Sequence, residues 1–371
     1  MEQLVYEVAL GLLPGIGDQL TRLLVSYCGS AKQAWLAPPG KLQKIPGIGQ
    51  AVINSFKANA GVLQQAEVIV QQAEKEKVKI LFYTNPAYPN RLKQIADAPA
   101  LLYYKGTADL NQAKIISIVG TRQCTSYGKD VTEQIIKDLA KYNALIVSGL
   151  AYGIDIAAHR AAVQNQLPTI GVMANGLDII YPAVHRKTAD KMLENGGLLS
   201  ENTFGTKPDA PRFPARNRII AGMADATIIV EAAIKGGTLI TADIANSYNK
   251  DIMAVPGPIH SPVSEGCNYL IKSHKAAIYT GIKDLEELLN WDQENSAANP
   301  TIKSKGVKYN PEDFTPDEYA IISLLENTKE EIIDNISWKT QISISQVASL
   351  LLTLEFKGVV KSLPGKKFQL T

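Results

Sequence analysis

Five short runs of apolar, mostly β-branched residues recur along the middle of this chain, with longer amphipathic stretches between them. They are IISIV at 115–119, ALIVS at 144–148, PTIGVM at 168–173, TIIVEA at 227–232 and IMAVPG at 252–257. Apolar runs of this length, separated by helices, are typical of parallel strands that are buried on both faces. The pattern therefore predicts an α/β fold built on a Rossmann-like, doubly wound, mainly parallel sheet.

The length of 371 residues exceeds what one hydrophobic core usually organises, so we expect more than one domain. The expected parts are a helical domain at 1–80, the Rossmann-like domain at 81–290 with its core from about 112, a linker at 291–310, and a small domain at 311–371. The linker is assigned from its polar composition.

The N-terminal part contains two similar segments, LLPGIGDQLTRLL at 12–24 and KIPGIGQAVINSF at 44–56. Each is typical of a helix-hairpin-helix, and the expected domain resembles a sterile-alpha-motif-like or helix-hairpin-helix region. The glycines permit a tight turn and leave amide hydrogens free at a helix start, where a phosphate can bind. A purely structural turn fits the same pattern. A long helix is expected at roughly 59–77, and the prolines and aromatics of 79–106 suggest an irregular connector.

The C-terminal part predicts a winged helix. A helix is expected to be capped by Thr315, with Pro316 at its first position. A helix-turn-helix pattern follows at 340–358, and then two strands around a Pro-Gly turn.

Composition narrows the function classes. The net charge is only +2, so affinity for a nucleic acid must come from a local basic patch. The three cysteines, Cys28, Cys124 and Cys267, are far apart in the sequence, which argues against disulfides and a cysteine-based zinc site. No apolar run reaches the roughly 20 residues of a membrane span, and the N-terminus lacks a basic leader. We therefore expect a cytoplasmic protein without a membrane segment.

The turn after the first strand, SIVGTRQCTSYG at 117–128, is a candidate anion site. Its spacing is not GxGxxG, so it does not satisfy the dinucleotide fingerprint. Gly120 still allows a phosphate to approach the backbone, and Arg122 offers a forked donor where the carboxyl ends of the strands meet. Ser126 and Gly128 are expected before the next helix.

The turn after the second strand repeats this arrangement with Ser148, Gly149 and Gly153 before a helix. Asp155 and His159 are four residues apart and share a helix face. A metal-binding or acid/base pair is one interpretation, but no third ligand is apparent. We prefer the alternative, in which Asp155 favours the helix start and His159 bonds to a neighbouring loop.

The densest basic cluster is KPDAPRFPARNRIIAG at 207–222. Its cations and the aromatic and amide side chains among them are Lys207, Arg212, Phe213, Arg216, Asn217 and Arg218. This composition is typical of a groove that follows a nucleic-acid backbone and stacks a base. A solvated helix face is the usual alternative, but prolines at 208, 211 and 214 are expected to keep most of the segment from forming a regular helix.

A fourth anion site is predicted in VEAAIKGGTLITADIA at 230–245. Lys235, Gly236, Gly237 and Thr238 stand at the start of a helix, where amide hydrogens and a cation can hold a phosphate. Glu231 is expected to orient the cations opposite. Four such sites at one sheet edge exceed what a mononucleotide needs, whereas a single strand with successive phosphates would use them all.

These motifs, in their order and spacing across 115–280, resemble those of the DprA/Smf family, DNA-processing protein A. They are VGTR with SxYG, SGLAYGIDxxAH, FPARNRIIAG, VEAAxKGGTLITA and VPGPIHSPVSEGCNYLI. The usual Ser-Gly pair before the last of the helices is Gly236-Gly237 here. The flanking helical and winged-helix domains also match, so the resemblance covers nearly the whole chain.

The resemblance implies a binding protein, not an enzyme, without a cofactor or metal. It implies binding of incoming single-stranded DNA during natural transformation, protection of that DNA from nucleases, and loading of the RecA recombinase. Carried over by position, Arg122 would hold a phosphate, the cluster at 207–218 would line the groove, and Phe213 would stack a base. It also implies a homodimer, with an interface that includes Asn268, Tyr269, Leu270 and Ile271.

Two other functions fit parts of the sequence. The first is a LOG-like nucleotide phosphoribohydrolase, but of its PGGxGTxxE signature only the GGT at 236–238 is present. The second is a duplex-DNA-binding regulator that acts through the winged helix, with the central domain sensing a nucleotide.

Overall fold

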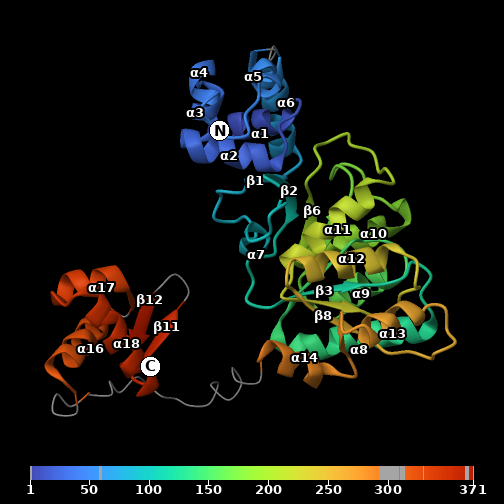
Figure 1. Ribbon diagram of the computed structural model, residues 1–371. Coiled ribbons are helices and arrows are strands. Elements are labelled where there is room, and N and C mark those ends of the chain that lie inside the picture. The colour runs from blue at the N-terminus through green and yellow to red at the C-terminus, as the bar shows by residue number, and fades with distance from the viewer. Residues whose placement is uncertain are drawn as a thin grey trace. The chain divides into compact units, whose positions relative to one another are not determined.

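The computed structural model describes residues 2–57, 61–291, 309, 314–328, 330–363 and 367–370. They belong to two compact units, 1–296 and 297–371. Figure 1 shows the first unit in blue to orange and the second in red. The expected linker at 291–310 lies almost entirely outside the described residues. No described helix is both apolar and long enough to pass through a bilayer.

A nine-stranded sheet organises the first unit, in the order β1-β2-β6-β5-β4-β3-β7-β8-β9. Its strands are β1 (Lys79–Phe82), β2 (Leu101–Gly106), β3 (Ile115–Val119), β4 (Leu145–Ser148), β5 (Thr169–Met173), β6 (Gly197–Ser200), β7 (Ala226–Ile229), β8 (Asp251–Ala254) and β9 (Ala277–Ile278). The strands from β6 to β9 in this order are all parallel, while β2 pairs antiparallel with both β1 and β6. All five predicted strands are present, and the Rossmann-like, mainly parallel sheet is confirmed.

The chain changes direction across the sheet at β3. It proceeds from β3 through β4 and β5 to β6, and then returns to the other side of β3 to form β7. In the register of this pair, Ile116 to Val119 of β3 face Ala226 to Ile229 of β7. The carboxyl ends of β3 and β7 therefore form a topological switch point, which is where open α/β sheets usually bind ligands.

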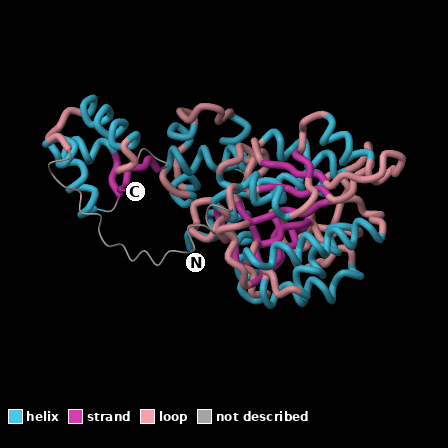
Figure 2. Tube along the Cα trace, turned by 90° about the horizontal axis from the view of Figure 1, so that it is seen from below, coloured by secondary structure: helices cyan, strands magenta, loops and turns pink. Residues whose placement is uncertain are grey.

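Helices cover both faces of this sheet (Figure 2). Their bounds are α8 (Ser126–Leu139), α9 (Ile154–Gln164), α10 (Arg186–Asn195), α11 (Arg212–Met223), α12 (Gly237–Ser247), α13 (Glu265–Lys272) and α14 (Ile282–Leu289). On one face, α8, α9 and α14 pack against side chains such as Ile116 and Ile118. On the other, α11, α12 and α13 pack against side chains such as Ile115 and Val119. The alternation of β3 side chains thus supplies both cores.

The segment at 79–106 is not the irregular connector that we expected. It contributes β1, the short helix α7 (Asn90–Lys93) and β2, which extend the sheet at one edge. The prolines that suggested irregularity lie in the loops around α7, and the Leu101–Gly106 run pairs with β6. The strands β6 and β9, of four and two residues, were also absent from the prediction.

In the described residues before this sheet, six helices follow one another. They are α1 (Glu2–Leu12), α2 (Asp18–Cys28), α3 (Ala31–Trp35), α4 (Pro39–Leu42), α5 (Gln50–Lys57) and α6 (Val62–Lys75). The two Pro-Gly-Ile-Gly sequences lie between α1 and α2 and between α4 and α5, with positive φ angles at Gly15 (76°) and Gly47 (82°). Both turns thus use the conformation that glycine adopts without strain. The long helix expected before the sheet is α6.

The second unit has the predicted winged-helix architecture. Its elements are α16 (Pro316–Thr328), β10 (Glu330–Ile332), α17 (Ile333–Thr340), α18 (Ile344–Phe356), β11 (Val360–Leu363) and β12 (Lys367–Leu370). Thr315 caps α16 as expected, because its hydroxyl accepts the Glu318 amide (3.3 Å) while the Glu318 carboxylate accepts the Thr315 amide (2.8 Å). The strand β10 was not predicted, and the Pro-Gly turn lies outside the described residues.

Candidate nucleic-acid interface

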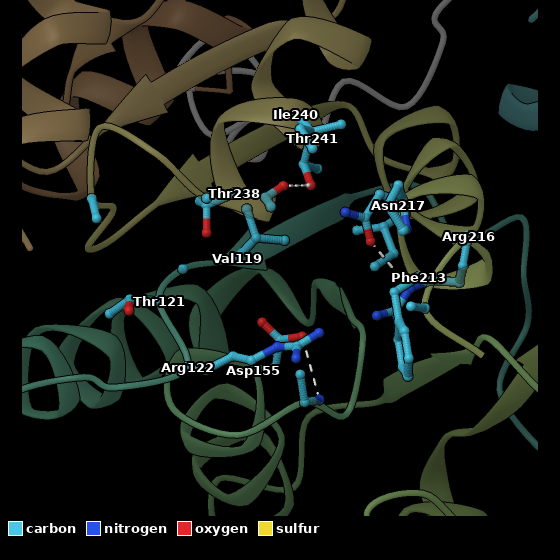
Figure 3. A pocket seen from close by; sticks show the side chains of 18 of the residues that line it. Val119, Thr121, Arg122, Asp155, Phe213, Arg216, Asn217, Thr238, Ile240 and Thr241 are labelled. Carbon is cyan, nitrogen blue, oxygen red and sulfur yellow. Dashed lines mark hydrogen bonds between the residues drawn. The ribbon is translucent and has the colours of Figure 1, made fainter. Parts of the chain in front are cut away.

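A cavity of about 780 Å³ opens at the switch point between β3 and β7. Its walls come mainly from the turn after β3, the turn after β7 with the start of α12, and the segment 208–220 that includes the first half of α11 (Figure 3). Ala151, Asp155 and Tyr181 complete the lining. The predicted site residues that line it are Arg122, Phe213, Arg216, Asn217, Lys235, Gly236, Gly237 and Thr238. Segments that are far apart in the sequence thus line one cavity, which we call the switch-point cavity.

Arg122 and Phe213 lie against each other in this cavity. The Arg122 guanidinium carbon is 5.3 Å from the centre of the Phe213 ring, within the range of a cation–π contact. Arg122 is exposed and Phe213 is half-buried, so both can meet a ligand. A positive charge beside an accessible ring is what a nucleotide needs, because the ring can stack a base while the cation holds a phosphate.

The start of α12 faces the same cavity. Its N-cap, Gly236, has no side chain to accept from the first-turn amides, and no side chain among the described residues caps them. A Cβ placed on Gly236 or Gly237 would meet nothing within 4 Å, so this turn is open. Lys235 is exposed beside it. Unsatisfied amide hydrogens, the positive end of a helix dipole and a lysine together make a site for an anionic group.

The turn after β3 differs from this one because the chain already satisfies its amides. The Glu231 carboxylate accepts the Thr125 amide (2.9 Å) and the Thr125 hydroxyl (2.5 Å), and the Thr125 hydroxyl in turn accepts the Gly128 amide (3.1 Å). We had expected Glu231 to orient the cations opposite. Instead, its carboxylate fixes the start of α8. Ser126 is exposed in the first turn of α8, outside the switch-point cavity.

The turn after β4 is satisfied in a similar way. The Asp155 carboxylate accepts the amides of Gly149 (3.1 Å) and Ala151 (3.4 Å), which confirms its expected role at the start of α9. The hydroxyl of Ser148 is buried and donates to the Ile118 carbonyl at 2.6 Å. At the start of α12, in contrast, no hydrogen bond from another part of the described chain is found for the amides of Gly237, Thr238 and Leu239.

Arg216 lines the cavity but is 4 % exposed. Its guanidinium donates to the carbonyls of Gly149 (2.7 Å) and Val172. A Cβ on Gly149 would lie 2.3 Å from this guanidinium, so the glycine makes room for it. Burial lowers the pKa of Arg216 to about 10, which still leaves the side chain charged at neutral pH, and the charge of Asp155 opposes this shift.

Arg218 follows Arg216 by two residues on α11, and two residues along a helix turn a side chain by about 200°. Arg218 therefore points away from the switch-point cavity. It donates to the Asp97 carbonyl and the Glu201 carboxylate, and lies 3.6 Å from the Asp18 carboxylate. Arg212 donates to Asn202 (2.7 Å) and, like Lys207, lies outside the cavity lining. Contacts of Lys207, Arg212 and Arg218 with DNA stay predictions.

The segment at 207–222 forms more helix than we expected, because α11 begins at Arg212. Pro211 is the N-cap, and Pro214 lies in the first turn. The amides of a first helical turn have no partner within the helix, so a proline there removes no hydrogen bond. This is why the prolines did not prevent a regular helix.

Asp155 and His159 do not form a metal site in the described residues, where no group of three potential ligands occurs. His159 is fully buried, and its Nδ1 lies 2.7 Å from the Thr169 hydroxyl. Thr169 belongs to β5, so the partner is a strand and not the expected loop. Burial lowers the pKa of His159 to about 3, so the ring is neutral in the folded protein at neutral pH.

The four residues proposed for a dimer interface have different environments. Leu270 is buried in the core, and the Asn268 amide group bonds with both the amide and the carbonyl of Gly257. Tyr269 is exposed and Ile271 is half-buried. The surface of α13 therefore offers only part of the predicted set, and the dimer stays a prediction.

Sequence reasoning missed Tyr181, which lines the switch-point cavity and whose ring centre lies 5.8 Å from that of Phe213. It lies in the loop between β5 and α10, where neither a glycine pattern nor a run of cations marked it. Asp209 also lines the cavity and was not among the predicted site residues.

Comparison with known proteins identifies two matching family models. The model described as "DNA recombination-mediator protein A" matches residues 79–290, and the "DprA winged helix domain" matches 310–366. Protein Smf of Synechocystis sp. is 31% identical over 391 aligned residues, which cover 98% of each chain.

Two solved structures are similar as well. DNA processing protein A (DprA) from Streptococcus pneumoniae superposes with a TM-score of 0.66 at 33% identity, over 77% of this chain and 96% of that one. DNA processing protein A from Helicobacter pylori, whose structure describes a single-stranded-DNA binding mode, superposes with a TM-score of 0.53 at 31% identity. That match covers 58% of this chain and 97% of the other.

Proposed function

We propose a function from one premise: this chain belongs to the DprA/Smf family of DNA recombination-mediator proteins. On that premise it binds single-stranded DNA, protects incoming DNA during natural transformation and loads the RecA recombinase onto it. It acts as a homodimer in the cytoplasm, and as a binding protein instead of an enzyme. The RecA contact and the dimer rest on the resemblance to the family.

The observation that carries the proposal is the pairing of Arg122 and Phe213 opposite the open start of α12. One wall of the switch-point cavity offers an aromatic ring and a guanidinium, and the other offers unsatisfied amides and Lys235. A base stacked on the ring and a phosphate at the helix start would both be satisfied. The similar H. pylori protein, whose structure describes single-stranded-DNA binding, supports this choice of ligand.

The two alternatives from the sequence fit this site less well. Only the GGT of the hydrolase signature is present, at 236–238, and the Asp155 carboxylate in the cavity is buried and already accepts two backbone amides. A duplex is also a poor fit, because stacking on Phe213 requires a base that is not held between its neighbours in a helix.

A titration with three ligands tests the proposal. A single-stranded oligonucleotide, the same sequence as a duplex, and a mononucleotide are compared by fluorescence anisotropy across a salt series. We expect the single strand to bind most tightly, with affinity falling as salt rises because bound phosphates release counterions. The Arg122→Ala variant should lose about one phosphate contact, which flattens the slope of log K against log salt by about 0.7.

Lys137→Ala is the matched control, because Lys137 is exposed in the last turn of α8, at the end of this helix that leads to β4 and not at the turn after β3. A protein that prefers the duplex or the mononucleotide, or an Arg122→Ala variant that binds like the control, would contradict the proposal.

A further inference from the structure

A second group of aromatic and basic side chains adjoins the switch-point cavity, and none of them was predicted to contact a ligand. Tyr152 is 49 % exposed on the turn between β4 and α9. Arg160 is exposed on α9, and Arg186 is exposed at the first position of α10. We call Tyr152, Arg160 and Arg186 the outer strip.

Tyr181 connects the cavity with the outer strip. It is 44 % exposed, lines the cavity and lies 5.8 Å from Phe213, centre to centre. Four residues further along the same loop, His185 contacts the Tyr152 ring edge to face, with 5.0 Å between ring centres. The segment 181–185 thus carries one ring that contacts Phe213 in the cavity and another that contacts Tyr152.

Tyr152 also adjoins the loop that carries Arg122. The next residue, Gly153, has a φ of +77°, and a Cβ there would lie 2.1 Å from the Thr121 carbonyl oxygen and 2.8 Å from the Arg122 Cα. The backbones of the two turns are thus in direct contact. The preceding residue, Ala151, lines the cavity. Tyr152 therefore stands at the rim of the cavity and not on a separate face.

The cations of the outer strip are on two helices that pack against each other, because α9 carries Arg160 and contacts α10, which carries Arg186. The helix α9 begins two residues after Tyr152. Arg186 follows His185 directly in the chain. Neither arginine forms an ion pair with a residue that the structure describes. Both charges are available to an anion from solution.

The switch-point cavity itself has room for only a short piece of a strand, because it offers one open row of amides, at the start of α12. A longer strand must leave the cavity across its rim. The rim at Tyr181 is the side on which exposed aromatic and unpaired basic side chains continue. Alternating rings and cations are what an unpaired nucleic-acid backbone with its bases requires.

We propose that the outer strip is an extension of the binding site, on which a single strand leaving the switch-point cavity stacks a base on Tyr152 and places phosphates on Arg160 and Arg186. This inference rests on the proposed function, since it assumes that the cavity holds single-stranded DNA. It assigns a binding role to three residues beyond the cavity and gives the strand a direction across the surface.

The test compares two lengths of strand with each variant. Trithymidylate is short enough for the cavity alone, whereas dodecathymidylate also reaches the rim. We expect Tyr152→Ala to weaken dodecathymidylate binding about tenfold, the effect of one lost stacked base, and to leave trithymidylate binding unchanged. Tyr152→Phe should restore the affinity, because the ring and not the hydroxyl makes the contact.

The double variant Arg160→Gln/Arg186→Gln tests the phosphate contacts. Its salt dependence with dodecathymidylate should flatten by about 1.4, the loss of two phosphates from a single strand. The matched controls are Tyr27→Ala, a tyrosine 54 % exposed on α2, and Lys137→Gln on α8. Circular dichroism spectra and melting temperatures confirm that each variant is folded.

Outcomes separate this inference from the function on which it rests. If the unchanged protein does not bind either strand, the proposed function fails. If it binds both strands and the outer-strip variants behave like the controls, the strand does not cross this rim and the inference is wrong. A loss confined to Lys207→Gln/Arg212→Gln would also overturn it, because the strand would then leave on the opposite side of α11.

Discussion

Arg216 and Phe213 are three residues apart on α11, and their surroundings show why the same helix can both bind a ligand and hold the fold. Phe213 is half-buried beside the exposed Arg122. Arg216 is enclosed, with its guanidinium on the carbonyls of Gly149 and Val172. Gly149 directly follows β4, and Val172 lies in β5. The arginine therefore connects α11 with the ends of β4 and β5 beneath the cavity.

We predict that Arg216→Met lowers the free energy of unfolding of the sheet unit by about 3 to 5 kcal/mol. The change removes the partner of two buried carbonyls and the positive charge nearest the buried Asp155 carboxylate. Urea denaturation followed by circular dichroism measures the loss, and Arg212→Met is the control on the exposed side of the same helix. Unchanged stability with a flatter salt dependence of DNA binding would instead make Arg216 a phosphate ligand.

The sequence alone predicted that Arg122 and the cluster at 207–218 belong to the site, but it did not show which of these side chains bind a ligand and which stabilise the fold. The cluster at 207–218 contains four cations, of which Arg216 and Arg218 are engaged inside the protein. Their partners, such as Val172 and Glu201, come from distant segments, and no local pattern identifies them. Arg122 and Phe213 were found because each stands in a motif whose position at the sheet edge the fold determines.

At the scale of elements, the start of α12 is the feature on which phosphate binding depends. Gly237→Ala should leave the fold intact, because a Cβ there meets nothing within 4 Å and alanine favours a helix. We predict at least about tenfold weaker binding of a single strand, the loss of one charge-assisted contact between a phosphate and the backbone. Anisotropy titrations measure the change.

Gly281→Ala is the matched control, since Gly281 also precedes a helix and has equally open surroundings. If Gly237→Ala binds DNA as tightly as this control, a phosphate does not approach the start of α12 closely.

The strands differ in how well the sequence predicts them. β3, β4, β5, β7 and β8 are runs of buried apolar residues, a signal that needs no knowledge of their partners. β1 and β2 flank a loop with several prolines, and β6 (Gly197–Ser200) has only two apolar side chains, between a glycine and a serine. β2 and β6 are stabilised by pairing antiparallel with each other. Because this pairing joins segments about 95 residues apart, a local sequence pattern cannot show it.

At the scale of the whole molecule, the winged-helix unit has no basic side chain on α18, the helix that would enter the major groove of a duplex. α18 has the sequence ISQVASLLLTLEF, without a lysine or arginine, and exposes Ile344, Leu352 and Phe356. Lys339 and Lys357 pair with Glu331 and Glu318. A recognition helix in the major groove needs polar or basic side chains for phosphates and base edges.

We predict that a chain ending at residue 296 binds both single-stranded and duplex DNA as tightly as the full chain does. Electrophoretic mobility shifts of the two proteins over the same concentration range provide the measurement. A full chain that binds the duplex more tightly than the shortened chain would show that the winged helix adds a duplex site.

Asp18 at the start of α2 accepts the Ala100 amide (2.8 Å) next to β2, and lies beside Arg218 of α11. The buried cluster that contains Leu10 and Ala66 of the first helices continues through Phe82 and Tyr103 into the sheet. A fragment that starts near residue 80 would therefore uncover an apolar surface and strip Arg218 of one counter-ion. A fragment prepared for crystallisation or binding studies should therefore retain α1 to α6, because their side chains form part of the hydrophobic core on one side of the sheet.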